Sequence, residues 1–207
     1  ARSVIVGGVS NLIKASDGSI VGGNANVVKG LYSFIGAGST NESANTSSFV
    51  GAGSNNIANN VYSVVCGGDT NLASGQYSSV LCGQTNKAVG NYSAILAGKG
   101  NIASGAYSLS FGQNSYIDQK FQGAILFGDS SNRVKNAVME NSLQVDATGG
   151  LRLLGGNLYL KMATGIPSGW NSPGISGQIS LSGSFLFICT GGVGTEFGWG
   201  RTSLTRW

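Results

Sequence analysis

The hydrophobic positions in the first part of the chain recur with a period of 15 residues, counted from Ser3. The clearest column of the repeat is β-branched and holds through seven successive units, at Ile5, Ile20, Ile35, Val50, Val65, Val80 and Ile95. A helical spacing of apolar residues is absent, and Gly is too frequent for helices. Short β-branched stretches in a fixed repeat predict strands that stack in coils, with this column as the structural core ladder.

Two polar columns repeat in the same register. The Gly column consists of Gly8, Gly23, Gly38, Gly53, Gly68, Gly83 and Gly98. The Asn column consists of Asn11, Asn26, Asn41, Asn56, Asn71, Asn86 and Asn101. Gly permits the positive φ of a tight turn. We interpret the Asn column as a second corner, because Asn tolerates the left-handed conformation, and as a hydrogen-bonded ladder between coils.

Each unit therefore predicts one coil made of two short strands and two turns. The second strand is marked by a small inward residue, at Ala58, Ala73, Ala88 and Ala103. Coils would stack at the interstrand spacing of roughly 4.8 Å, so seven of them span about 34 Å. The predicted fold class is all-β, with a parallel β-solenoid over residues 1–117.

The regular pattern ends where Gln113 replaces the Gly and Tyr116 replaces the Asn. We interpret residues 118–150 as an irregular last coil and a neck. Residues 151–207 hold all three Trp and both Pro, and they predict a small C-terminal β tip or trimerisation domain. Within it, residues 178–181 and 185–189 are expected to form a hairpin.

Composition narrows the possible functions. The 35 Gly residues recur in register and the chain is 41% hydrophobic, which favours ordered architecture over a disordered linker. The net charge is +4, and the basic residues are too few and too scattered to form a nucleic-acid interface. No apolar run approaches the roughly 20 residues of a membrane span. The cysteines are isolated and His is absent, so we expect no set of side chains that binds a metal or cofactor. Cys82 is interpreted as a small buried residue.

Catalytic chemistry is not expected. A nucleophile needs a base beside it, and the chain has no His. Glycosidases need paired carboxylates some 5–10 Å apart, and none of the eight acidic residues recurs at a coil-stacking offset with another. We therefore predict a non-enzymatic protein without cofactors.

The repeat resembles a known family. The segment Ala106–Gly112, with the sequence Ala-Tyr-Ser-Leu-Ser-Phe-Gly, is similar to head repeats of trimeric adhesins of the YadA type. The similarity covers roughly the first 128 residues and implies a left-handed β-roll in which three chains pack together. The period of 15 here differs from about 14 in that family, which also lacks the strict Asn column.

The end of the chain carries a second resemblance. Gly177–Ile179, Phe185–Thr190 and Trp199–Trp207 are similar to the C-terminal tips of many phage and large-virus fibre proteins. The closing pattern is Trp-x-Arg-x-x-Leu-x-x-Trp. Together the resemblances imply a homotrimeric viral fibre or spike. The thin apolar core of each coil independently favours burial against further copies of the chain.

Aromatic and basic residues near the C-terminus are the candidate functional residues. They are Tyr159, Trp170, Trp199, Arg201, Arg206 and Trp207. Such side chains stack on sugars or anchor a protein receptor. The other interpretation is that they plug the base of the trimer.

The leading hypothesis is therefore a structural component of a viral fibre or spike, extracellular on the virion surface, that mediates host attachment. Its expected partners are other copies of the chain, other virion proteins, and a host surface glycan or protein receptor. Nucleic-acid binding and membrane insertion are not expected. The alternatives are a fragment of a trimeric cell-surface adhesin and a trimeric polysaccharide depolymerase.

Overall fold

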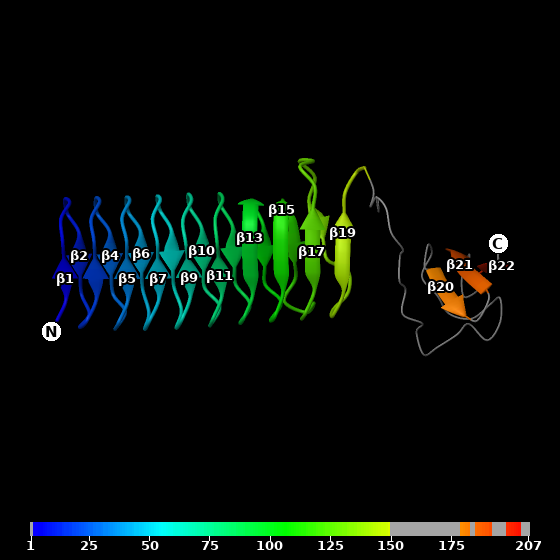
Figure 1. Ribbon diagram of the computed structural model, residues 1–207, viewed down its shortest axis with the longest axis horizontal. Coiled ribbons are helices and arrows are strands. Elements are labelled where there is room, and N and C mark those ends of the chain that lie inside the picture. Colours follow the sequence, from blue (N-terminus) through cyan, green and yellow to red (C-terminus); the bar gives the residue numbers. More distant parts are fainter. Residues whose placement is uncertain (1, 150–178, 183–184, 192–197, 204–207) are drawn as a thin grey trace. The chain divides into compact units, whose positions relative to one another are not determined.

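The computed structural model describes residues 2–149, 179–182, 185–191 and 198–203, and the chain divides into two compact units, 1–151 and 152–207. The first unit is a parallel β-solenoid, and no helix occurs in the described residues. The predicted all-β solenoid is therefore confirmed. Figure 1 shows its coils stacked side by side from β1, in blue, to β19, in yellow.

Two parallel sheets form the solenoid, because each coil contributes one strand to each sheet. Sheet A contains β1 (Val4–Ile5), β3 (Ser19–Ile20), β5 (Phe34–Ile35), β7 (Phe49–Val50), β9 (Val64–Val65), β11 (Ser79–Val80), β13 (Ala94–Lys99), β15 (Leu109–Gln113), β17 (Ile125–Gly128) and β19 (Leu143–Asp146). Sheet B contains β2 (Leu12–Ile13), β4 (Val27–Val28), β6 (Glu42–Ser43), β8 (Ile57–Ala58), β10 (Leu72–Ala73), β12 (Lys87–Ala88), β14 (Ile102–Ala103), β16 (Ser115–Ile117) and β18 (Lys135–Asn136).

The core lies between the two sheets. The β-branched column is fully buried from Ile20 to Ile95, and the Ala column of sheet B faces it with no exposed surface. Ile5 departs from the predicted ladder, since 45% of it is exposed. It lies in the first coil, where a neighbouring coil covers it on one side only.

The Asn column is a buried hydrogen-bond ladder. In the example of Asn56, the side-chain Nδ2 donates to the carbonyl oxygens of Ala52 (3.1 Å) and Gly68 (2.8 Å). Its Oδ1 accepts from the N–H of Asn71 in the next coil at 3.1 Å. The pattern repeats along the column from Asn11 to Asn101. Each side-chain amide therefore links its own coil to the next one.

The left-handed corner does not fall on the Asn column, so that part of the interpretation is wrong. None of the column's seven Asn residues has a positive φ. The left-handed residue is the one before it, as at Thr70 with φ 58°. A further left-handed corner lies at the Tyr column, for example Tyr77 with φ 57°. Asn is selected here by its buried amide rather than by its backbone preference.

The solenoid continues beyond the predicted end of the repeat. Ile95 pairs with Ser110, but Gly98 pairs with Gly112, so one residue is lost within the coil. Gly112 consequently takes the turn, with φ 100°, and the N–H of Ser115 donates to Asn101 Oδ1 at 3.0 Å. The register is preserved although the columns shift by one residue.

Residues 118–146 add a longer coil and a last strand of sheet A. β17 pairs with β15 and β19 pairs with β17, while β18 extends sheet B from β16. Ile117, Ala124, Leu126 and Ala137 form the core of this part. The sheets therefore run to Asp146, through the segment expected to be partly a neck.

The second unit contains a three-stranded antiparallel sheet. Its strands are β20 (Ile179–Ser182), β21 (Phe185–Gly191) and β22 (Gly198–Ser203). Ser182 pairs with Phe185, so β20 and β21 form the predicted hairpin. β22 pairs with the other edge of β21.

Candidate functional site

Two of the candidate C-terminal residues lie in the described part of the second unit. Trp199 pairs with Cys189, and Arg201 pairs with Phe187, so both are in β22 at alternate positions. Tyr159, Trp170, Arg206 and Trp207 lie outside the described residues. The candidate functional surfaces with described side chains therefore lie on the solenoid.

The outer face of sheet A is apolar along its whole length. It consists of the two columns that flank the β-branched column, namely Val4, Ser19, Phe34, Phe49, Val64, Ser79, Ala94, Leu109, Ile125 and Leu143, and Val6, Val21, Gly36, Gly51, Cys66, Leu81, Leu96, Phe111, Phe127 and Val145. None of these positions is charged. Side chains such as Val6 (71% exposed) and Leu143 (63%) are open to solvent.

In several coils of this face, a large residue in one column lies beside a small residue in the other. Phe34 and Phe49 stack at a centroid distance of 5.3 Å in the coils where the other column holds Gly36 and Gly51. Ser79 likewise lies beside Leu81, whereas Leu109 lies beside Phe111, so that coil has large residues in both columns. The face is therefore apolar in every coil.

The outer face of sheet B has a different character. Its outward columns include Lys14, Lys29, Glu42, Lys87 and Asp118 among polar and apolar residues. Lys29 and Glu42 form an ion pair between neighbouring coils at 2.6 Å. Charged side chains of both signs are typical of a solvated surface.

The Tyr column forms an aromatic ladder at one turn of the coil. Tyr62, Tyr77, Tyr92 and Tyr107 stack with centroid distances of 4.9–5.0 Å and nearly parallel rings. Each of these rings remains between 43% and 64% exposed. The stacking stabilises the turns of four successive coils while the ring edges face solvent.

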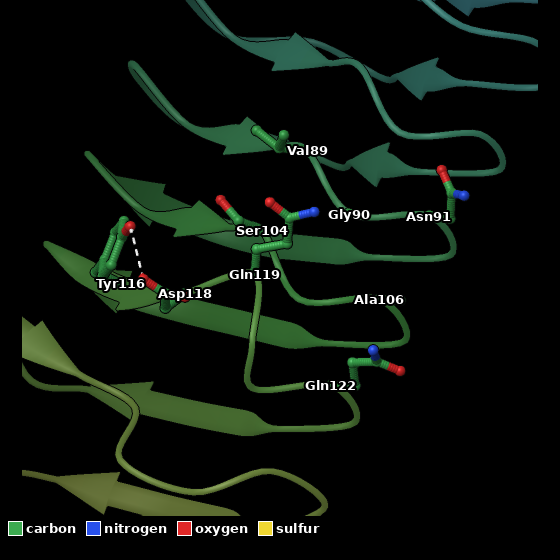
Figure 2. A pocket seen from close by; sticks show the side chains of 9 residues that line it. All are labelled: Val89, Gly90, Asn91, Ser104, Ala106, Tyr116, Asp118, Gln119 and Gln122. Carbon is green, nitrogen blue, oxygen red and sulfur yellow. Dashed lines mark hydrogen bonds between the residues drawn. The ribbon is translucent and has the colours of Figure 1, made fainter.

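A groove of about 460 Å³ lies beside β14 and β16, where the irregular coil departs from the repeat. Polar side chains from three coils line it: Asn91, Ser104, Asp118, Gln119 and Gln122. Figure 2 shows Tyr116 and Asp118 at one end, Gln119 near Ser104 in the middle, and Asn91 and Gln122 toward the turn. The groove therefore gathers hydrogen-bonding groups along its length.

The loop after β16 is held in place by its own carboxylate. Asp118 Oδ1 accepts from the N–H of Lys120 at 3.0 Å, and the Tyr116 hydroxyl lies 3.5 Å from Asp118 Oδ2. On the adjacent coil, Asn91 Oδ1 accepts from the N–H of Gln76 at 3.0 Å. The lining groups are thus anchored to the backbone.

A second hollow, of about 420 Å³, shares Tyr116 and Asp118 with the groove. Its other lining residues include Phe121 and Val138, and Lys120 Nζ lies 4.9 Å from the centre of the Phe121 ring. Tyr116 and Asp118 therefore contribute to two hollows.

A buried ammonium closes the ladder in the last full coil. Lys135 pairs with Ser115, so it occupies the position of the Asn column. Its Nζ is fully buried and donates to the carbonyl oxygens of Ser131 (2.7 Å) and Gln113 (2.9 Å). It also lies 3.2 Å from the Asp129 carboxylate. The ammonium thus donates hydrogen bonds to backbone carbonyl oxygens, as the Asn amides do in earlier coils.

Asp129 is the acceptor that organises the loop between β17 and β18. A hydrogen bond from the Ser131 hydroxyl, followed by bonds from Thr148 and Lys135, holds the pKa of Asp129 well below its usual range. The Thr148 N–H donates to Asp129 Oδ2 at 2.6 Å. This cluster is structural, since each group is satisfied by a neighbour.

The described residues hold no cluster of three or more His, Cys, Asp or Glu that fits a metal ion. Cys66 and Cys82 are exposed free thiols, so the expectation that Cys82 is buried was wrong. Cys82 lies in the turn after sheet A, outside the core. Among the residues placed by the structure, no helix has the length and apolar character needed to cross a membrane.

No protein-family model matches the chain, and no curated protein matches it. The site must therefore be interpreted from its own geometry. Sequence reasoning missed the groove, because its lining comes from three coils with unequal spacing. A signal was present in the spacing of 16 residues between Phe111 and Phe127, where the period departs from 15.

Proposed function

We propose that this chain is a structural subunit of a homotrimeric viral fibre or spike that mediates host attachment. The observation that carries the proposal is the outer face of sheet A, which is uncharged through ten strands. Exposed apolar faces of this kind mark interaction sites on soluble proteins. The occupant we infer is a further copy of the same chain.

The dimensions of the face favour a copy over an unrelated partner. Ten strands are separated by nine spacings of roughly 4.8 Å, so with a width of about 10 Å the face measures about 430 Å² in projection. A partner that packs along all of it must present rows with the same repeat. A parallel copy of the solenoid has this repeat, so its rows of side chains lie in register. Closed threefold symmetry gives every copy the same environment.

The viral assignment is supported by the resemblance of the C-terminal segment to fibre tips. A solenoid with backbone hydrogen bonds between successive coils makes a stiff spacer, which suits a fibre that presents a receptor-binding part. The proposed partners are other copies of the chain, other virion proteins and a host surface glycan or protein. The proposed location is the virion surface, and no catalytic role is included.

Two alternatives share the solenoid. A trimeric cell-surface adhesin would have the same apolar interface, and finding a coiled coil or membrane anchor in the full-length gene would favour it. A trimeric depolymerase would need carboxylates from two chains across one groove. Co-purification of the chain with virus particles favours the fibre, and its absence from them favours the adhesin.

The oligomeric state in solution tests whether the outer face of sheet A is an interface between copies of the chain. Light scattering should give about three times the 21.0 kDa mass of the chain. Leu81→Asp places a charge on the outer face of sheet A and should yield monomers. The matched control, Ile57→Asp, changes a similarly exposed residue on sheet B and should leave the trimer intact. A wild-type chain that remains monomeric with an unchanged β spectrum would refute the proposal.

A further inference from the structure

The groove beside Tyr116 and Asp118 brings together four kinds of group that recognise sugars. Asn91 and Ser104 come from regular coils, whereas Asp118 and Gln119 come from the longer loop after β16. Amides, hydroxyls and a carboxylate thus line a recess with one aromatic residue (Figure 2). Its volume of about 460 Å³ lies within the range of small-molecule sites.

The free hydrogen-bonding capacity of the lining points to hydroxyl groups. Within the part of the chain that the structure describes, the amides of Gln119 and Gln122 and the Ser104 hydroxyl have no protein partner. Amides and hydroxyls both donate and accept hydrogen bonds, and so do sugar hydroxyls. A ligand rich in hydroxyls therefore matches this lining.

The charge of the groove restricts the ligand further. No Lys or Arg lines it, and Asp118 contributes a carboxylate. A sialylated or sulfated glycan in the groove would place an anion near Asp118, whereas Lys120 lines the adjoining hollow and its Nζ lies over the Phe121 ring. The recess therefore favours an uncharged sugar.

Tyr116 and the second hollow extend the site. The side chain of Tyr116 lines both hollows, so its ring lies where two adjoining sugar units would meet. Aromatic side chains combine an apolar surface with a polar tip, which suits the two faces of a pyranose. Two adjoining hollows fit a disaccharide or longer chain better than one sugar.

We propose that this groove binds a neutral oligosaccharide. Asp118, Gln119 and Ser104 bind sugar hydroxyls, and the Tyr116 ring packs against a sugar ring. The inference rests on the proposed function, because it names the chemical class of the host receptor. It places a receptor site on the solenoid flank, apart from the C-terminal residues.

The experiment uses the full chain and a panel of defined sugars. The neutral probes are lactose, maltose, mannobiose and diacetylchitobiose, and the charged probes are sialyllactose and a sulfated heparin disaccharide. Saturation-transfer NMR and calorimetry should detect a neutral probe with a millimolar Kd, and the charged probes at least about tenfold weaker.

Matched variants exploit the repeat. Ser104→Ala with Gln119→Ala should weaken binding about tenfold or more. The control Ser74→Ala changes the same repeat position two coils away, outside the groove, and should bind as the wild type does. Circular dichroism and light scattering should show the same fold and mass for all variants.

Three outcomes would overturn the site: no neutral probe binds up to about 20 mM, charged probes bind better, or the Ser104 and Gln119 variants bind normally. The proposed function is judged separately, by trimer mass and attachment to host cells. Attachment without sugar binding refutes the glycan site and leaves the fibre. Sugar binding by a monomeric chain that does not attach refutes the fibre and leaves the site.

Discussion

The backbone conformation of single residues sets the direction in which their N–H groups donate hydrogen bonds between coils. Most backbone N–H groups donate to the following coil, as Leu72 does to Asn86. The left-handed residues reverse this direction, because the N–H of Thr70 donates back to Ser54 and that of Tyr77 to Val61. The cost of the left-handed backbone, about 1–2 kcal/mol, is thereby offset by a bond to the preceding coil.

The buried amides of the Asn column yield the sharpest test at this scale. Asn56→Asp replaces a donor by a charged acceptor that faces the carbonyl oxygens of Ala52 and Gly68. We expect a loss of at least about 3 kcal/mol, which lowers Tm by about 6–12 °C. The matched control is Asn55→Asp, one residue earlier, where the side chain is exposed and Asp tolerates the left-handed backbone. Equal melting curves for the two variants would contradict the ladder.

At the scale of elements, each strand of two residues depends on its neighbours in adjacent coils. Residues in one column repeat the same contact from coil to coil, as the four nearly parallel rings of the Tyr column do. The loop between β17 and β18 relies instead on the Asp129 carboxylate and its donors. Regular coils are thus stabilised by contacts that repeat in every coil, and the irregular coil is stabilised by the polar cluster around Asp129.

Stacking in the Tyr column should contribute measurable stability. Tyr77→Ala removes contacts with Tyr62 and Tyr92 and should cost about 1–2 kcal/mol. Tyr32→Ala is the matched control, because Tyr32 has the same left-handed backbone but no stacking partner among the described residues. Chemical denaturation should show the smaller loss for Tyr32→Ala. Equal losses would mean that the backbone, rather than stacking, decides the effect.

The Asp129 loop should respond to acid. The pKa of Asp129 is lowered in the folded chain by the Ser131 and Thr148 donors, so its stabilisation is present above the ordinary carboxyl pKa of about 3.9. It is lost as the pH falls from there toward the folded pKa. Hydrogen exchange at the Ser131 and Thr148 amides, corrected for intrinsic rates, should accelerate below about pH 4. Asp129→Asn should exchange fast already at pH 6, and slow exchange there would refute this role.

At the scale of the whole molecule, the two units have separate sheets. Sheets A and B contain residues up to Asp146, and the third sheet consists of β20, β21 and β22. No strand pairing connects them in the described parts of the chain. The solenoid should therefore fold without the C-terminal unit.

A chain that ends at residue 151 tests this division. We expect it to keep the β spectrum and a trimeric mass, because the outer face of sheet A is retained. Monomers of unchanged β content would assign assembly to the C-terminal unit. In the full chain, Arg201→Ala and Trp207→Ala then separate the two interpretations of the tail: loss of cell binding by intact trimers indicates a receptor site, and loss of the trimer indicates a capping role.

The 15-residue columns alone determined the solenoid, its core and its Asn ladder, because each coil lies on the one before and equal sequence spacing becomes direct contact. Tertiary structure decided what periodicity does not encode. It moved the left-handed corner from Asn71 to Thr70, since only backbone geometry sets the direction of each N–H. It also placed Ser115 and Lys135 in the Asn column and assembled the groove at Asp118, because after a deletion or insertion the register depends on which strands pair.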